Sequence, residues 1–212
     1  NDLETTHREL AQAGYMVYAL DSRGQGANAR LDEYHYKDMA SDVYEFIKLK
    51  GLEKPAVFGF SDGGNLGIVF TLAHQDRVKS LVIMGSNINT WGTNTFDQIQ
   101  ITYQYIVLCV EALIKGDRET KIRRDIKGMM VGQPSLTFKD ISEIKVPVLN
   151  IYGEHDMIQR WHSKKITKSI ENAKELMVIG GGQVNGIVDA RTTTKEEIGL
   201  MMVKSKGGNA DE

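Results

Sequence analysis

The sequence predicts an α/β protein: a mostly parallel β-sheet with helices on both faces and a small helical insertion. Three observations support this class. Short segments rich in β-branched and aromatic residues are apolar throughout instead of alternating, which is typical of strands buried on both faces. Segments with helical spacing lie between them, and one long stretch holds two helical patterns without a strand. The expected strands span residues 15–20, 56–60, 80–85, 146–153 and 176–179.

The expected helices show apolar residues three or four positions apart. Segment 36–50 is an example, with Met39, Val43, Phe46 and Ile47 on one face. The other core helices are expected at 2–13, 64–74, 160–171 and 194–204, and the two helices of the insertion at 96–115 and 118–131. The expected domains are an α/β core of residues 1–86 and 145–204, a helical cap of 87–144 and a tail of 205–212.

The helix expected at 96–115 has a broad apolar face. Lining an acyl pocket is one role for this face, but we expect most of its side chains to pack on the core. The face comprises Ile101, Tyr105, Ile106, Leu108, Cys109, Val110, Leu113 and Ile114. Three aromatic residues are expected at the mouth of a pocket: Trp91, Phe96 and Tyr103.

Composition excludes several classes of protein. The chain has 212 residues, a net charge of −2 and a single cysteine, Cys109. It is long enough for one core, and one cysteine allows no internal disulfide framework. The charge gives no reason to expect binding to nucleic acid or to an anionic membrane, and no apolar run reaches the ~18–20 residues of a membrane span. We expect a cytoplasmic protein without metal or cofactor, since no metal-ligand spacing is present.

Residues 59–63 carry the motif most informative about chemistry. Gly59, Ser61 and Gly63 fit G-x-S-x-G, and the motif lies between an expected strand and an expected apolar helix, as a nucleophile elbow requires. We expect the tight turn to give Ser61 a strained backbone and to leave no room for a Cβ on Gly59 or Gly63, with Gly64 relieving the crowding further. A Gly-rich turn without catalytic function, or a phosphate-binding loop, is the alternative, although a phosphate loop would favour a lysine or a longer glycine run.

An elbow serine needs a base, and the base needs an orienting carboxylate. In this kind of fold they follow in the order Ser, Asp/Glu, His, each just after a strand. Asp156 comes directly after the strand expected at 146–153 and is the first choice for the acid, with Glu154 as the second. A carboxylate in such a turn also serves as a helix N-cap, which is the non-catalytic alternative.

With these motifs the chain resembles the α/β-hydrolase superfamily, and more narrowly its small bacterial hydrolases. The resemblance runs from residue 3 to about residue 188. The matching segments are residues 19–26 (a loop similar to D-x-R-G-x-G), 39–43, 59–65, 76–82, 144–149 and 153–158. The resemblance implies Ser61 as nucleophile, Asp156 as the acid and the N–H of Asp62 as one oxyanion donor.

The sequence departs from this family in two respects. A hairpin and a strand ending in a His-Gly loop normally precede the first helix of the family, and that loop supplies the second oxyanion donor; no such segment precedes residue 2 here. In addition, Gln183 occupies the position at which the resemblance implies the base histidine. An amide cannot accept and return a proton near neutral pH.

Five other positions hold a histidine that could replace the base: His7, His35, His74, His155 and His162. None lies in the turn that the resemblance assigns to the base. We expect His7 and His74 to be solvated. His155 and His162 follow the strand that leads to Asp156, so they are better candidates than His35.

The leading hypothesis is a serine hydrolase that acts on small esters or related acyl compounds through an acyl-enzyme at Ser61, inactive or nearly so if Gln183 leaves it without a base. A protein of the same fold that binds a ligand or partner without catalysis is the main alternative. Related chemistry on this scaffold, such as C–C bond hydrolysis, is a third. The expected partner is a small acyl compound, and a homo-oligomer is a further expectation.

The first testable prediction concerns association. If strands of the family's sheet have no counterpart here, one edge or face of the sheet is left uncovered, and such surfaces promote association. We therefore expect residues 1–212 to bind a hydrophobic dye or to form oligomers, measured by dye fluorescence and light scattering. A monomeric, dye-negative chain with a cooperative melting transition would contradict this expectation.

Overall fold

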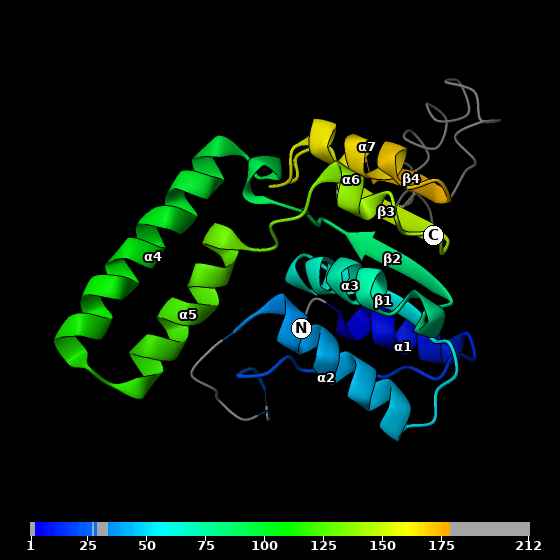
Figure 1. Cartoon of the computed structure of the whole chain (residues 1–212), viewed down its shortest axis with the longest axis horizontal. Helices are drawn as coiled ribbons and strands as arrows, with labels where there is room; N and C mark the ends of the chain where they lie inside the picture. The colour runs from blue at the N-terminus through cyan, green and yellow to red at the C-terminus, as the bar shows by residue number, and fades with distance from the viewer. Residues whose placement is uncertain (1–2, 27, 29–33, 179–212) are drawn as a thin grey trace, which may run out of the picture.

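In the part of the chain that the structure describes, the β-sheet is parallel and has four strands. The structure is a computed structural model, and it describes residues 3–26, 28 and 34–178. Figure 1 shows the sheet, whose spatial order is the chain order: β1 (Ala56–Phe60), β2 (Ser80–Met84), β3 (Val148–Gly153) and β4 (Ala173–Val178). Every neighbouring pair is parallel. Four of the five expected strands are thus confirmed, and the α/β class with them.

The helices agree with the expected segments over most of the chain. Those expected are α1 (Glu4–Gln12), α2 (Tyr36–Leu49), α3 (Asp62–Ala73), α4 (Thr95–Lys115), α5 (Arg118–Gly132) and α7 (Arg160–Ser169). Three short helices were not expected: η1 (Gln75–Arg77), η2 (Thr90–Gly92) and α6 (Phe138–Ile141). The helix expected at 194–204 and the tail lie outside the described residues.

The fifth expected strand, at residues 15–20, is not a strand. This segment has no regular secondary structure, and Tyr15, Met16, Tyr18 and Leu20 are 42–79% exposed. A β-rich segment becomes a strand only where another strand offers it ladder hydrogen bonds. Here Tyr18 instead packs edge-on against Phe46 of α2, with ring centroids 5.4 Å apart. The prediction of a strand at 15–20 is therefore wrong, because the described residues provide no partner strand for it.

The loop after this segment is fixed to α2 by a single cation. Arg23 donates to both carboxylate oxygens of Asp42, from Nε at 2.6 Å and from Nη2 at 2.7 Å, and its Nη2 also donates to the carbonyl of Asp38. This fork geometry is the one that arginine makes best. It explains why two of the segments that carry the family resemblance, 19–26 and 39–43, belong together.

The core lies between one face of the sheet and the helices that cover it. Ile68 of α3, Leu81 and Ile83 of β2, and Ile166 of α7 are fully buried in one cluster. Ile88, Ile141 and Ile144, all from the segment expected as a cap, belong to the same cluster. The other side of β1 is more open, since Phe58 and Phe60 are 37% and 40% exposed. Division of the chain into core and cap at residues 87 and 144 remains a prediction.

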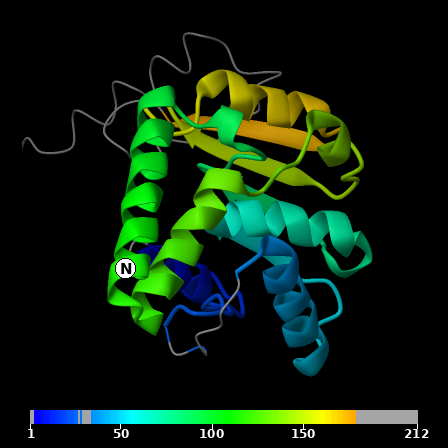
Figure 2. The same cartoon turned by 60° about the vertical axis from the view of Figure 1, so that its left-hand side comes forward.

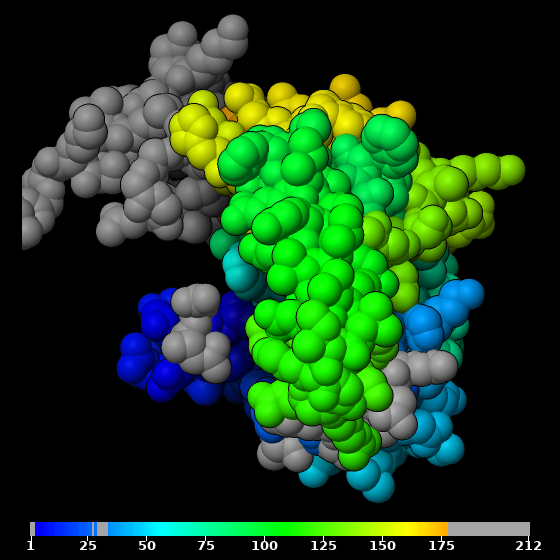
Figure 3. Space-filling model, turned by 90° about the vertical axis from the view of Figure 1, so that its left-hand side faces the viewer, coloured from blue at the N-terminus to red at the C-terminus, as the bar shows by residue number. Residues whose placement is uncertain are grey.

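The helices α4 and α5 form a hairpin that stands away from the sheet (Figures 1 and 2). Its attachment runs through α5, where Ile122 and Met129 pack with Tyr34, Tyr36 and Met39. The buried residues of α4 are Ile101, Leu108 and Ala112. A helix with one helical neighbour buries one side only, and Figure 3 shows the outer side of α4 facing the viewer along its length.

The expectation that most apolar residues of this helix pack on the core is therefore wrong for half of them. The exposed members of the expected face are Ile106, Val110, Leu113 and Ile114. Even so, no helix in the described part of the chain combines the length and apolar character needed to cross a membrane.

Tight packing of backbone on backbone shapes the turn between β1 and α3. A Cβ on Gly59 would overlap the carbonyl group of Gly63, and a Cβ on Gly64 would overlap the hydroxyl of Ser86. A Cβ on Gly63, by contrast, would meet nothing within 4 Å. The expected steric requirement is thus confirmed for Gly59 and Gly64 and wrong for Gly63.

These glycines give a matched pair of variants. Gly59→Ala places a methyl group against backbone that cannot move aside, so we expect a loss of at least ~2 kcal/mol in the free energy of unfolding. Gly63→Ala lies in a helix with free space, so it should be neutral or stabilise the protein by up to ~1 kcal/mol. Urea unfolding curves would measure both; equal effects would contradict the packing described here.

A buried histidine fixes the loop after β2 to α7. His162 is fully buried, and its Nε2 accepts the N–H of Ile88 at 3.2 Å. The ring lies edge-on to Phe138 and Trp161, and a Cβ on Gly92 would overlap it. Burial, with a smaller contribution from a nearby lysine, lowers the pKa of His162 to about 4. The imidazole is therefore neutral in the folded protein at neutral pH.

This shift in pKa predicts a pH dependence of stability. The unfolded chain binds a proton at His162 with a pKa near 6.5, whereas the folded chain does so only near 4. Stability should fall as the pH drops from about 6.5 to 4, by about 3 kcal/mol at most. Urea unfolding at several pH values should show this slope reduced in His162→Gln, whose amide oxygen can accept the Ile88 N–H. In His155→Gln, which removes an exposed imidazole, the slope should persist.

Candidate active site

The site is built at the carboxyl edge of the sheet, where the turns after β1, β2 and β3 meet. Ser61 follows β1 and precedes α3 with φ 52° and ψ −118°, and among the described residues it is the one non-glycine with positive φ. Its N–H donates to the carbonyl of Met84 at the end of β2, at 2.8 Å. The predicted strained backbone of Ser61 is therefore confirmed. A side chain held this way is lifted above the sheet edge.

The hydroxyl of Ser61 is not used by the helix that it precedes. Serine at this position usually caps the helix through its side chain, but Ser61 makes no side-chain capping bond. The first turn of the helix is stabilised instead by the backbone carbonyl of Ser61, which accepts hydrogen bonds from the N–H groups of Gly64 at 2.9 Å and Asn65 at 3.1 Å. The hydroxyl thus remains available for chemistry.

Asp62 presents two groups to this edge. Its N–H is the first of α3 and has no acceptor within the helix, so it belongs to the positive end of the helix dipole. Its carboxylate accepts the hydroxyl of Tyr36 at 2.5 Å. Tyr36 is buried, and burial together with this carboxylate raises the pKa of its phenol. The sequence does not predict Tyr36 as a residue of this site, because an aromatic residue at the start of an amphipathic helix suggests only packing.

Asp156 lies in the turn after β3 and close to the end of β2. Its carboxylate accepts the N–H groups of Gly153 at 3.3 Å and Ile158 at 3.2 Å. A Cβ on Gly85 would lie 3.3 Å from Asp156 Oδ2, so the carboxylate stands over the residue that follows Met84. Ser61 and Asp156 are thus on either side of the end of β2. Glu154, the second choice for the acid, has its Oε1 4.0 Å from Nη1 of Arg160 in α7.

The histidines of the described residues do not supply a base to this carboxylate in the structure. Both hydrogen bonds that Asp156 accepts come from backbone N–H groups. His162 faces Ile88 in the core, as described above. His35 lies beside Gln133, with 3.0 Å between its Nδ1 and the amide nitrogen, and His155 is exposed. Gln183 lies outside the described residues, so its role stays a prediction, as do the roles of Ser61, Asp62 and Asp156.

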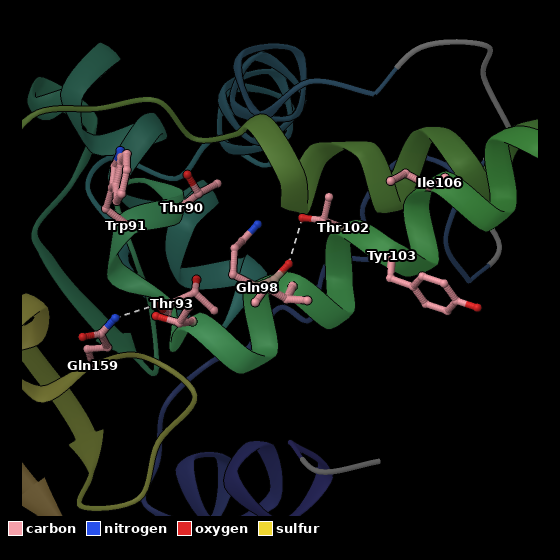
Figure 4. A pocket seen from close by; sticks show the side chains of 10 residues that line it. Thr90, Trp91, Thr93, Gln98, Thr102, Tyr103, Ile106 and Gln159 are labelled. Atoms are coloured by element: carbon pink, nitrogen blue, oxygen red, sulfur yellow. Dashed lines mark hydrogen bonds between the residues drawn. The ribbon is translucent and has the colours of Figure 1, made fainter.

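A cavity of about 420 Å³ opens between η2, the first turns of α4 and the loop that follows Asp156 (Figure 4). Its lining is uncharged and combines hydroxyl and amide groups with aromatic and aliphatic surface. The lining residues are Thr90, Trp91, Thr93, Thr95, Gln98, Ile99, Thr102, Tyr103, Ile106 and Gln159. Of the three aromatic residues expected at a pocket mouth, Trp91 and Tyr103 line it and Phe96 does not. Such a lining suits a neutral ligand with an apolar part.

No metal-binding group is evident in the part of the chain that the structure describes: its His, Cys, Asp and Glu side chains nowhere gather in threes. The described residues place a hydroxyl, a helix N-terminus and a carboxylate along one edge of the sheet.

Comparison with known proteins agrees with this geometry. Residues 6–105, which include the elbow, match the family described as alpha/beta hydrolase fold. The sequence is 36% identical over 92 residues to the protein named "Putative carbamate hydrolase RutD" of Cronobacter turicensis, a match covering 42% of this chain and 34% of that protein. It is 21% identical over 190 residues to human serine hydrolase BPHL, covering 79% of this chain and 62% of that one.

Among solved structures, a marine microorganism esterase superposes with a TM-score of 0.64 and 23% identity, over 84% of this chain and 82% of that one. That likeness concerns the fold. The matched segment spans about a third of the length of the RutD relative. The parallel sheet, the strained serine turn and these similarities show that the chain has the α/β-hydrolase fold.

Proposed function

We propose that this chain is built for serine hydrolase chemistry on small esters or related acyl compounds. The observation that carries the proposal is the strained turn at Ser61, which presents an uncommitted hydroxyl beside the first N–H of α3. Strain of this kind is kept where function requires it. Relatives named as hydrolases support the reaction class.

In this proposal Ser61 attacks the acyl carbon and forms an acyl-enzyme. The oxyanion that develops on the carbonyl oxygen is stabilised by the N–H of Asp62 and by the N-terminal end of α3. Asp156 orients the general base, which takes the proton of Ser61 and returns it to the leaving group. The cavity beside Gln159 has an uncharged lining that would suit a neutral acyl compound, although Ser61, Asp62 and Asp156 are not among its lining residues.

The described residues bring no general base to the carboxylate of Asp156. Gln183 stands at the expected histidine position, and a carboxamide does not exchange protons at neutral pH. We therefore propose that the chain as given turns over slowly at most. The alternative function, non-catalytic binding of an acyl ligand, is favoured by the same residue, because binding requires no proton transfer.

A single substitution tests the reaction. Removal of one triad member costs about 10⁴-fold in turnover, so the given chain should hydrolyse p-nitrophenyl acetate feebly and Gln183→His should hydrolyse it much faster. The gain stays incomplete if an oxyanion donor is lacking, a loss of about 10²–10³-fold. Gln183→His/Ser61→Ala is the matched control and should return to the background rate.

The outcomes separate the two functions. Rapid, Ser61-dependent turnover by the given chain would show that another residue is the base, and His155→Gln would be the next variant to measure. If Gln183→His gains nothing and Ser61 resists a fluorophosphonate probe while an acyl ligand binds at micromolar concentration, the non-catalytic function replaces the hydrolase.

A further inference from the structure

The residues just after β2 occupy a special place, because β2 lies between β1 and β3 in the sheet. The strand before it leads to the elbow and the strand after it leads to Asp156. A residue that follows β2 can therefore link the elbow to the loop that carries Asp156. Asn87 is such a residue, three positions beyond the end of β2, and nothing in the mechanism above uses it.

Asn87 is joined to the elbow helix by two reciprocal hydrogen bonds. Its N–H donates to Oδ1 of Asn65 at 2.9 Å, and its Oδ1 accepts from Nδ2 of Asn65 at 2.8 Å. Asn65 is buried, 5% exposed, and its own N–H donates to the carbonyl of Ser61 at 3.1 Å. The pair thus connects Asn87 to the backbone of the proposed nucleophile through a single residue.

The other side of Asn87 is joined to the loop that precedes α4. Its Nδ2 donates to the carbonyl of Asn89 at 2.8 Å and to the hydroxyl of Thr93 at 3.3 Å. The side-chain amide therefore uses both of its donor hydrogens and accepts one bond in addition. An amide does this, whereas a carboxylate or an alkyl side chain of the same size cannot.

The loop at Thr93 is in turn bonded to the residues just after Asp156. Thr93 pairs with Ile158 in an antiparallel bridge, and the N–H of Asn94 donates to the carbonyl of Met157 at 2.8 Å. The side chain of Gln159 donates to the carbonyl of Thr93 at 2.9 Å, drawn as a dashed line in Figure 4. Ile158 itself holds the Asp156 carboxylate through its N–H.

From this continuous chain of bonds we propose that Asn87 is a positioning residue, which sets the distance between the elbow of Ser61 and the loop of Asp156. The proposal deepens the proposed function and rests on it for its kinetic consequence. Asn87 touches no reacting atom; it acts through Asn65 on one side and Thr93 on the other. Loss of the amide should loosen both sides together.

The variant Asn87→Ala tests this, with Asn150→Ala as the matched control. Asn150 is a buried asparagine, whereas Asn87 is half-buried, and the Nδ2 of Asn150 donates to the carbonyl of Ser163 and the hydroxyl of Thr167. The variant Asn150→Ala removes two side-chain hydrogen bonds between β3 and α7, and it leaves the hydrogen bonds through Asn65, Asn87 and Thr93 in place. Thr93→Val, which removes the hydroxyl acceptor and keeps the volume, serves if Asn87→Ala does not fold.

Two measurements are needed. Amide hydrogen exchange should speed up about tenfold in Asn87→Ala at both Asn65 and Gln159, with the β2–β3 amides unchanged. In the Gln183→His background, kcat for p-nitrophenyl acetate should fall by about 10²-fold with KM within about twofold, since a misplacement of about 1 Å costs that much in rate. Asn150→Ala should show neither effect, and Thr93→Val should show the exchange effect at Gln159.

The proposal is overturned if Asn87→Ala lowers kcat no more than Asn150→Ala does, or if the exchange rate rises on one side only. Failure of the proposed function looks different: no variant, including Gln183→His, shows Ser61-dependent turnover. In that event the exchange rates alone decide, and a concerted rise at Asn65 and Gln159 supports the positioning role while its absence overturns it.

Discussion

The structure of the site depends on one steric constraint, the absence of room for a Cβ at Gly59 and Gly64. Because the end of β1 and the start of α3 approach so closely, the residue between them takes a backbone conformation that L-amino acids avoid. That conformation is stabilised by the bond from Ser61 to the end of β2. The close contact between the end of β1 and the start of α3 thus fixes both elements and the hydroxyl of Ser61, and the other residues of this sheet edge are arranged around it.

Much of this arrangement follows from the sequence. Apolar runs at 56–60 and 80–84 predicted parallel strands, and the spacing of Met39, Val43 and Ile47 predicted α2, because those patterns are local consequences of burial. The segment 15–20 has an equally good pattern and is not a strand, since pairing is not local. The β-propensity of a segment shows that it can form a strand, but the hydrogen bonds of a strand also require a neighbouring strand.

The site was predictable only where chemistry leaves a local signature. The strained serine turn and the carboxylate after β3 occur at fixed offsets from strands, so Ser61 and Asp156 could be named from the sequence. Tyr36, Asn65 and Asn87 could not, because their contacts join segments separated by more than 20 residues. The steric role expected of Gly63 is wrong and that of Gly64 is confirmed, because the order of two neighbouring glycines in a sequence does not show which of them meets another element.

The hairpin of α4 and α5 makes its attachment to the core mainly through Ile122 and Met129 of α5, while α4 contributes to the cavity through residues such as Ile99 and Tyr103. The attachment of the hairpin to the core and the lining of the cavity are therefore provided by different helices. Mutation can change the lining on α4 without disturbing the joint on α5 or the turn at Ser61. Variation of the cavity lining on α4 is therefore independent of the close packing that fixes the strained turn.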